Sequence, residues 1–169
     1  MNGRPLISII TITYNASSTI PMTMKSVSEQ TFTDFEHLVI DGASSDDTIL
    51  VARRMGSEGL RIVSEPDNGL YDAMNKGLRM ARGQYVIFMN SGDRFHAPDT
   101  LAAYASAILK RHPDIIYGDT DIVAPGGKRI GPRHLSAPEI LTFDSFSKGM
   151  LICHQAFMVK KNIAPFYDT

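Results

Sequence analysis

The sequence has a single cysteine and almost no net charge. Cys153 has no second cysteine with which to pair, so an intramolecular disulfide is excluded, and we interpret this residue as a small core hydrophobe rather than a reactive thiol. The 17 basic and 18 acidic side chains give a formal net charge of -1. This balance removes the electrostatic attraction on which nucleic-acid binders depend, so we expect no nucleic-acid partner.

Long apolar runs are also missing. No segment approaches the length of a membrane span, and residues 1–5 lack the succession of charged, apolar and small residues that marks a signal peptide. We therefore expect a cytoplasmic protein with no transmembrane segment. Two phosphate-binding patterns, the Walker motif and the dinucleotide fingerprint, are missing as well. The hydrophobic content of 43% is enough for one well-packed domain.

Strand and helix patterns alternate over the first half of the chain. Runs rich in β-branched and other apolar side chains predict strands at residues 6–13, 36–40, 60–64 and 85–90. Between them, apolar residues at helical spacing predict three helices. The first would be capped by Ser17 or Ser18 and the second by Ser44 or Ser45, and the third would cover residues 70–81. This alternation is typical of an α/β fold in which helices cover both faces of a parallel sheet.

The pattern becomes less regular after residue 93. We expect a helix at residues 98–111, a strand at 114–123 and a hairpin turn at 125–128. From residue 130 onward the signals are mixed, because prolines interrupt short apolar pieces.

The most informative segment is residues 84–93. Its apolar run is too short for a membrane span and too continuous for a half-exposed strand, so it predicts a strand covered on both faces. The run ends abruptly in Asn90, Ser91, Gly92 and Asp93. Parallel sheets bind ligands just beyond the carboxyl ends of their strands, so this strand would deliver Asp93 to a cleft. A carboxylate beside a glycine suits a hard divalent cation that bridges ligand phosphates.

Polar groups also end two other predicted strands. Tyr14 and Asn15 follow the first strand, and Asp41 and Ser44 follow the second. If these strands neighbour the strand that ends at Asn90, the polar groups converge. An aromatic ring there could stack on a base, and Asp41 could accept a hydrogen bond from a base or a ribose. Alternatively, each strand-end aspartate is only a cap or a turn former.

Other residues have both a functional and a structural interpretation. Asp72 and Lys76 lie four apart on the predicted third helix, either as part of a site or as an ordinary surface ion pair. His154 could contact an acceptor sugar or a metal, or it could finish a buried strand. The remaining histidines lack the spacing of a zinc site, and we interpret them as surface or cap residues: His37, His96, His112 and His134.

Five stretches occur together in one order: residues 8–15, 38–48, 64–77, 84–93 and 153–155. In these stretches the chain resembles the family 2 glycosyltransferases, particularly the bacterial branch that builds capsular polysaccharides and exopolysaccharides such as colanic acid. The resemblance implies a GT-A fold, a Rossmann-like three-layer sandwich with a mostly parallel central sheet. It also implies a nucleotide-diphosphate-sugar donor, a magnesium or manganese ion, and inversion at the anomeric carbon of the sugar.

The resemblance gives the candidate residues roles. Donor-binding residues would be Thr13, Tyr14, Asn15, Asp41, Ser44, Asp72, Lys76, Asn90 and Ser91. Asp93 would hold the metal, and His154 would contact the acceptor side. Many relatives have an acid at the position of Asn90, so this chain would offer the metal fewer charged ligands.

The resemblance also implies a general base, a carboxylate that removes the proton from the acceptor hydroxyl. Similar sequences carry this base shortly after a segment like residues 165–169, so we expect it beyond Thr169. Asp144 and Asp168 are interpreted as turn or cap residues. We therefore expect residues 1–169 to be a glycosyltransferase domain that is truncated on its carboxyl-terminal side. The acceptor would be a saccharide or a lipid-linked saccharide, and the latter would draw the enzyme to the inner face of a membrane.

Two alternatives stay open. A non-catalytic module that binds a nucleotide sugar would explain Asn90 and the expected position of the base. A sugar nucleotidyltransferase of related fold ranks third, because it predicts a glycine-rich basic loop after the first strand, and residues 14–18 contain none.

Overall fold

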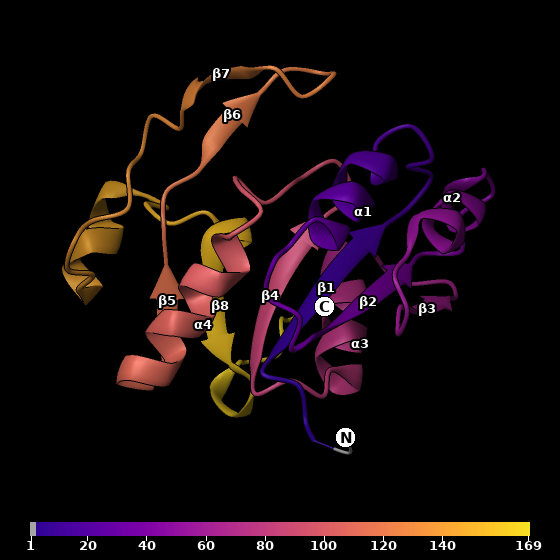
Figure 1. Ribbon diagram of the computed structural model, residues 1–169. Helices are drawn as coiled ribbons and strands as arrows, with labels where there is room; N and C mark the ends of the chain where they lie inside the picture. The colour runs from indigo at the N-terminus through magenta and orange to yellow at the C-terminus, as the bar shows by residue number, and fades with distance from the viewer. Residues whose placement is uncertain (1–2) are drawn as a thin grey trace.

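Six strands form a central sheet in the order β3-β2-β1-β4-β8-β5 in the computed structural model, which describes residues 3–169 (Figure 1). Four of them run parallel: β1 (Ile7–Thr13), β2 (Phe35–Asp41), β3 (Arg61–Ser64) and β4 (Tyr85–Asn90). Strand β8 (Phe157–Lys160) is antiparallel to its two neighbours, β4 and β5 (Ile115–Tyr117). The predicted α/β class with a mostly parallel sheet is confirmed.

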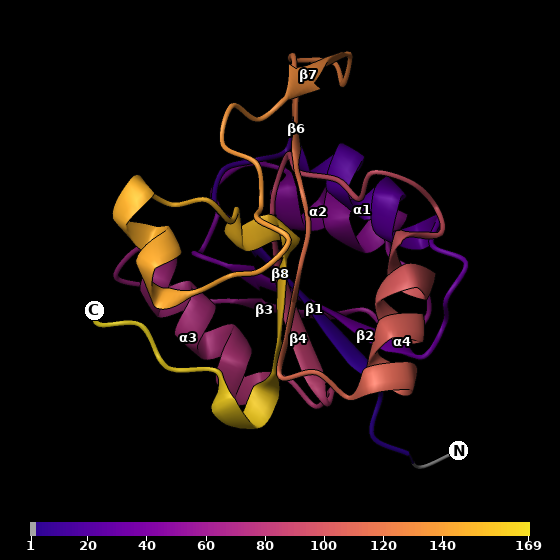
Figure 2. The ribbon, with the colours of Figure 1, turned by 90° about the vertical axis from the view of Figure 1, so that its left-hand side faces the viewer.

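Helices cover both faces of this sheet. They are α1 (Ile20–Ser28), α2 (Thr48–Met55), α3 (Leu70–Met80) and α4 (Thr100–Arg111). Figure 2 views the sheet nearly edge-on, with α3 on one side and α1 and α4 on the other. The side chains agree, because Val27 of α1 and Leu101 of α4 pack in one cluster with Ile9 of β1, whereas Met74 of α3 packs in another with Ile10. The fold therefore has three layers.

The two central strands are buried on both faces. All seven residues of β1 and the first five of β4 are buried. A fully buried side chain such as Ile9 or Ile87 stabilises the fold by about 1.5–3 kcal/mol, so these strands hold the sheet together. The continuous apolar runs of the sequence follow from this double burial, and the prediction for the strand before Asp93 is confirmed.

The predicted helix caps are wrong. Helix α1 begins after Thr19 and α2 after Asp47, and neither capping side chain makes a cap hydrogen bond. The predicted caps Ser44 and Ser45 instead bond across loops to Asn15, since the Ser44 hydroxyl accepts from the Asn15 N–H and the Ser45 N–H donates to the Asn15 side chain. Long-range partners thus took the serine hydroxyls and amides that a local cap would have used. Ser17 and Ser18 precede α1 without capping it.

The predicted strand at residues 114–123 is also wrong as one element. It divides into β5, in the main sheet, and β6 (Asp121–Val123), which pairs with β7 (Arg129–Pro132) in a separate two-stranded sheet. The division falls at Gly118, whose N–H donates to the carbonyl of Ala156 at 3.1 Å. The predicted hairpin turn is confirmed, with Gly126 and Gly127 at positive φ. The β6–β7 ribbon projects away from the main sheet (Figure 1).

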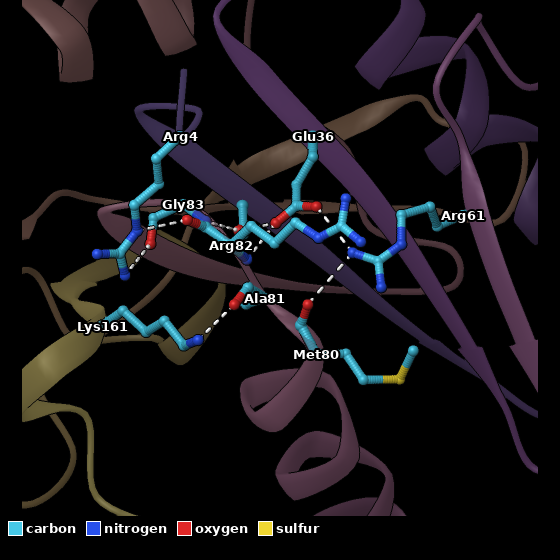
Figure 3. A network of polar contacts seen from close by, with 9 residues as sticks. Arg4, Glu36, Arg61, Met80, Ala81, Arg82, Gly83 and Lys161 are labelled. Atoms are coloured by element: carbon cyan, nitrogen blue, oxygen red, sulfur yellow. Dashed lines mark hydrogen bonds and ion pairs between the residues drawn. The ribbon is translucent and has the colours of Figure 1, made fainter. Parts of the chain in front are cut away.

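The parallel strands begin at one edge of the sheet, here called the amino edge, and a polar network lies there (Figure 3). Glu36 accepts hydrogen bonds from the Ser8 hydroxyl at 2.6 Å, from Arg61 at 3.0 Å and from the N–H of Arg82. Burial raises the pKa of Glu36, but these hydrogen bonds outweigh burial and leave its pKa below the ordinary value. The network is therefore built around an ionised carboxylate.

Cations at the amino edge also complete the end of α3. Arg61 donates to the carbonyl of Met80 at 3.2 Å, and Arg4 donates to that of Arg82 at 2.6 Å. Lys161 donates to the carbonyl of Ala81 (Figure 3). Cations near a helix C-terminus satisfy carbonyls that have no partner within the helix. A hollow of about 1100 Å³ opens at this edge.

One histidine contradicts its predicted place. His37 is buried rather than on the surface, and its Nε2 lies 2.9 Å from the hydroxyl oxygen of Thr11. Burial lowers the pKa of His37 to about 4, so the ring is neutral at pH 7. His112 is a cap as predicted, because it ends α4 in the left-handed conformation.

The last residues run along α3. After the short helix η3 (Lys161–Ile163), the chain reaches Asn75, whose side-chain amide donates to the carbonyl of Tyr167 and accepts from its N–H, each at 2.9 Å. The ring of Tyr167 stacks on Tyr71, with centroids 5.1 Å apart. Within residues 3–169, no helix is both long and apolar enough to cross a membrane.

Candidate functional site

A cleft of about 750 Å³ lies at the opposite edge of the sheet, the carboxyl edge, where the parallel strands end. Its walls come from the ends of β1 and β4, from the loop after β1, and from the loop before α3. Five predicted site residues line it: Thr13, Tyr14, Asn15, Asn90 and Ser91. The strand order explains this convergence, because β1 lies between β2 and β4. The prediction that these strand ends meet is confirmed.

The loop after β1 is bonded to the loop after β2. Asn15 adopts a left-handed conformation (φ 44°), which asparagine tolerates better than most residues. Its N–H donates to the Ser44 hydroxyl at 2.8 Å, and its side-chain oxygen accepts from the N–H of Ser45 at 2.9 Å. Tyr14 points its ring outward from this frame and is 65% exposed. An exposed ring on a fixed backbone is available for stacking.

Asp41 lies beneath this frame with no exposed surface. It accepts hydrogen bonds from the Ser44 N–H at 2.9 Å, from the Ser64 hydroxyl at 2.6 Å and from the Ser44 hydroxyl. Asp41 and Ser44 therefore shape the loop. This agrees with the alternative interpretation of Asp41 as a turn-forming residue. A direct contact of either residue with a ligand stays a prediction.

Gly42 allows close packing next to Asp41. A Cβ at this position would lie 2.7 Å from Oδ2 of Asp67 and 3.3 Å from Cδ2 of Tyr14. Only a residue without a side chain lets the loop before α3 approach Tyr14 this closely. The narrow cleft wall beside the tyrosine ring depends on this glycine.

The turn after β4 presents Asp93. Gly92 has a φ of 102°, a left-handed value that favours glycine, and the N–H of Asp93 donates to the carbonyl of Asn90 at 2.9 Å. The Asp93 carboxylate accepts a hydrogen bond from Nε2 of Gln155 at 3.0 Å. Burial raises the pKa of Asp93, while the Gln155 hydrogen bond and nearby His154 oppose the rise.

Residues around η2 (His154–Ala156) complete this side of the site. Nε2 of His154 lies 3.4 Å from Nδ2 of Asn90, and burial lowers the pKa of the imidazole while Asp93 opposes that shift. The Cys153 thiol donates to Oε1 of Gln155. Cys153 is only half-buried and lies outside the hydrophobic clusters, so its prediction as a core hydrophobe is wrong. Its thiol instead helps to orient the amide that holds Asp93.

Three buried oxygens at the cleft have no hydrogen-bond partner among the described residues. They are Oγ1 of Thr13, Oδ1 of Asn90 and Oγ of Ser91. A buried polar group without a partner costs about 1–3 kcal/mol, and native proteins keep few of them. These three lie on neighbouring strand ends, since Ile12 of β1 is paired with Asn90 of β4. Ordered water or a bound ligand would supply their partners.

The same groups fit a hard divalent cation. Such cations bind carboxylate and amide oxygens, and Asp93 with the unpartnered Oδ1 of Asn90 supplies one of each. Residues 3–169 contain no group of three or more His, Cys, Asp and Glu side chains that could hold a metal. A cation bound here would therefore take further ligands from phosphate oxygens and water.

Asp72 and Lys76 brace the loop before α3. Nζ of Lys76 lies 3.1 Å from Glu65 and 3.8 Å from Asp72, and it donates to the carbonyl of Pro66 at 2.6 Å. Asp72 also accepts from the N–H of Asn68 at 3.1 Å. The two side chains form the predicted ion pair, but they use it to fix a wall of the cleft. Their contact with a donor stays a prediction.

The carboxylates considered as a base lie elsewhere. Asp144 is in the first turn of η1 (Phe143–Lys148), and Asp168 follows Tyr167; both are exposed, and neither lines the cleft. Two residues that matter were missed as site residues. Gln155 donates a hydrogen bond to the Asp93 carboxylate, and the hydroxyl of Thr23 in α1 accepts one from the N–H of Gly92. Neither contact has a local sequence signal.

Solved structures share this architecture. The chain superposes on S. aureus TarS 1–349 in complex with UDP-GlcNAc with a TM-score of 0.74, at 23% identity, covering 92% of this chain and 45% of that one. It superposes on the mannosyltransferase PcManGT from Pyrobaculum calidifontis, in complex with GDP-Man and Mn²⁺, with a TM-score of 0.59. That match has 27% identity and covers 74% of this chain and 37% of that one. The fold is a GT-A fold.

The sequence defines the family. The model of the glycosyl transferase family 2 matches residues 8–164, and the chain belongs to this family. It is 32% identical to a PGL/p-HBAD biosynthesis glycosyltransferase of Mycobacterium bovis over 163 residues, which is 94% of this chain. It is also 32% identical to TuaG of Bacillus subtilis, named for teichuronic acid biosynthesis, over 154 residues, which is 89% of this chain. The chain spans 60% of the length of each relative.

Proposed function

We propose that this domain binds a nucleotide-diphosphate sugar with Mg²⁺ or Mn²⁺ and that the whole protein transfers the sugar, with inversion, to a saccharide acceptor. The observation that carries the proposal is the group of unpartnered oxygens of Thr13, Asn90 and Ser91 beside Asp93. A sugar diphosphate with its cation offers both hydroxyl donors and a positive charge to such a group. The family membership of the chain supports the same reaction.

Each wall of the cleft would meet a different part of the donor. The exposed ring of Tyr14 would stack on the base, on a loop that Asn15, Asp41 and Ser44 hold in place. Asp72 and Lys76 would border the base or ribose. Asn90, Ser91 and Thr13 would meet the sugar diphosphate. PcManGT, solved with GDP-Man and Mn²⁺, and TarS, solved with UDP-GlcNAc, support a donor of this class.

Asp93 would hold the cation, with Oδ1 of Asn90 beside it. The cation supplies neutralisation of the charge that develops on the leaving diphosphate. Gln155 keeps the carboxylate oriented, and burial raises the pKa of Asp93, an effect that a bound cation would oppose. His154 lies next to Asn90 and would face the acceptor.

The acceptor side is proposed more broadly. TuaG, named for teichuronic acid biosynthesis, supports a role in cell-surface polysaccharide synthesis, and we extend this to the exopolysaccharide branch that the motifs resemble. A cytoplasmic enzyme working on a lipid-linked acceptor would associate peripherally with the inner face of the membrane. The base would lie beyond Thr169, as the resemblance implies, and neither Asp144 nor Asp168 lines the cleft.

Calorimetry with UDP and GDP, each with and without Mn²⁺, tests the donor site. We expect one nucleotide to bind more tightly with Mn²⁺, and Asp93→Asn to weaken that binding by about 100-fold or more, as expected for loss of a metal ligand. Asp99→Asn is the matched control, because Asp99 is exposed at the start of α4 and its side chain makes no cap hydrogen bond. Absence of binding by either nucleotide, or an unaffected Asp93→Asn protein, would contradict the proposal.

A non-catalytic nucleotide-sugar-binding module is the second candidate. Asn90 favours it, because the turn then offers the cation a single carboxylate, that of Asp93. Transfer and hydrolysis assays on the full-length protein separate the two candidates. Donor binding without turnover under all acceptors tried would favour the module.

A further inference from the structure

Helix α1 carries a polar stripe on the face that meets the chain after β4. Thr23, Ser26 and Gln30 are spaced by three and four residues, so they lie on one side of the helix. Ser26 accepts from the N–H of Phe95 at 3.4 Å. Gln30, just beyond the helix, accepts from the N–H of Leu101 at 3.0 Å. The stripe therefore bonds α1 to the segment that begins with the Asp93 turn.

Thr23 makes the most specific of these contacts. It has no exposed surface, and its hydroxyl oxygen accepts from the N–H of Gly92 at 2.9 Å. The same hydroxyl donates to the carbonyl of Asp93 at 2.7 Å, with the carbonyl of Asn90 farther away at 3.3 Å. One side chain thus holds the backbone on both sides of the Asp93 side chain. Fixing these two peptide groups sets the direction in which the Asp93 side chain leaves the backbone, and Gln155 then holds its carboxylate.

The same helix also faces the other wall of the cleft. Thr19, one turn before Thr23, lines the cleft, and a Cβ on Gly92 would lie 3.5 Å from the Cβ of Thr19. The loop that precedes α1 contains Asn15 and Ala16, which are bonded to the loop after β2. Helix α1 therefore links the frame around Tyr14 to the turn that carries Asp93.

We infer that Thr23 is a positioning residue that sets the Asp93 carboxylate for cation and diphosphate binding. The inference rests on the proposed function, because it assigns Thr23 a purpose in donor binding. Residues that orient a metal ligand without touching the metal commonly change metal affinity by about 10–100-fold when they are replaced. Thr23 acts on Asp93 through the backbone instead of through the carboxylate itself.

The test compares Thr23→Val, Thr23→Ser and Thr11→Val. Valine keeps the shape of threonine and removes the hydroxyl, whereas serine keeps the hydroxyl. Thr11 is the matched control, because it is equally buried in the neighbouring strand but its hydroxyl bonds only His37. Mn²⁺ binding is measured by electron paramagnetic resonance with whichever of UDP or GDP binds the wild type. Amide hydrogen exchange at Gly92 and Asp93 is measured without any ligand.

We expect Thr23→Val to weaken Mn²⁺ binding in the presence of nucleotide by about 10-fold or more, with a smaller effect on the nucleotide alone. Thr23→Ser should bind Mn²⁺ nearly as tightly as the wild type, because serine keeps the hydroxyl. Thr11→Val should bind Mn²⁺ as the wild type does. Without ligand, the amide of Gly92 should exchange about 10-fold faster in Thr23→Val than in Thr11→Val, since it has lost its acceptor.

Equal Mn²⁺ affinity in Thr23→Val and the wild type would overturn the inference and leave the proposed function intact. Absence of nucleotide binding by the wild type would overturn the proposed function, and the inference with it. If Thr23→Val does not fold by circular dichroism, Thr23→Ala takes its place in the same comparison. An unprotected Gly92 amide in the wild type would overturn the inference without any variant.

Discussion

The two edges of the same sheet make opposite use of their polar groups. At the amino edge, Glu36 accepts three hydrogen bonds, and Arg4, Arg61 and Lys161 donate to carbonyls (Figure 3). At the carboxyl edge, three buried oxygens have no partner among the described residues. The hollow at the amino edge is nevertheless the larger, about 1100 Å³ against 750 Å³. Unmet hydrogen bonds, and not the size of the hollow, distinguish the proposed binding site from the amino edge.

The difference has a physical origin. The amino edge receives the last carbonyls of α3, and cations complete them, so its charges serve folding. At the carboxyl edge, hydrogen bonds on the side away from the cleft hold the loops that follow the strands. Thr23 holds the turn after β4, and Asp41 with Ser44 holds the loop after β2. Thr13, Asn90 and Ser91, the residues with unpartnered oxygens, line the cleft. Substitutions at the first edge should therefore change stability, and those at the second should change binding.

The largest expected effect on stability is at Glu36. Replacing Glu36 by alanine leaves the Ser8 hydroxyl, the Arg82 N–H and the Arg61 guanidinium without their acceptor, so the free energy of unfolding should fall by about 2–3 kcal/mol. Glu29→Ala is the control, because its pair with Lys25 is exposed and contributes less than about 1 kcal/mol. Urea denaturation measures both. A Glu36→Ala protein with wild-type stability, or with lost Mn²⁺-dependent nucleotide binding, would break the comparison.

One serine at each edge gives an intermediate effect, on stability at the amino edge and on binding at the carboxyl edge. Ser8 at the amino edge donates to Glu36 and accepts from the N–H of Gly83 at 2.8 Å, so Ser8→Ala should cost about 1–3 kcal/mol of stability and leave nucleotide binding unchanged. The Ser91 hydroxyl has no partner among the described residues, so Ser91→Ala should keep or raise stability and weaken binding by about 3–10-fold. Denaturation and calorimetry on both variants test the contrast. Similar losses of stability in the two variants would remove it.

The smallest effect is the pH dependence of stability. The folded pKa of Glu36 lies below its ordinary value of 4.5, so its stabilisation is present above about pH 4.5 and is lost as the pH falls through the folded pKa. Burial raises the folded pKa of Asp93 above 3.8, so its contribution is present below that value and is lost as the pH rises through the folded pKa.

Denaturation curves measured from about pH 3 to pH 7, in steps of about one pH unit, test both pH dependences. The wild type is compared with Glu36→Gln and with Asp93→Asn, in which an amide replaces the carboxylate. Relative to Glu36→Gln, the wild type should gain stability with rising pH. Relative to Asp93→Asn, it should lose stability with rising pH. Slopes of the same sign for the two comparisons would show that the edges do not differ in this respect.

Much of the fold could be predicted because its signals are local. Strand β1 is rich in isoleucine and threonine, and β4 is an apolar run that ends in a polar residue. These patterns predicted both central strands and the convergence of Tyr14, Asn15 and Asn90 at the cleft. The split between β5 and β6 was missed although the sequence signals it, because Gly118 and Asp119, which lie between the two strands, both have low β-propensity.

The rest could not be predicted because its causes are far apart in the chain. Gln155 and Asp93 are 62 residues apart, and the Thr23 hydroxyl meets Gly92 across 69. A threonine in a short amphipathic helix gives no sign of such a partner. The serine caps failed for the same reason, since Ser44 and Ser45 bond across loops. The expected position of the catalytic base beyond Thr169 stays a prediction.

The hydrogen bonds between Asn75 and Tyr167 do not depend on the side chain at position 167. Asn75 binds only the N–H and the carbonyl of residue 167, as one strand binds another. Nearly any amino acid can occupy that position and still be anchored to α3, and proline is the exception because it has no N–H. A change of side chain at position 167 therefore gives up the stacking on Tyr71 but keeps the backbone contact with α3. Asn75 of α3 can therefore hold this segment while the side chain at position 167 varies.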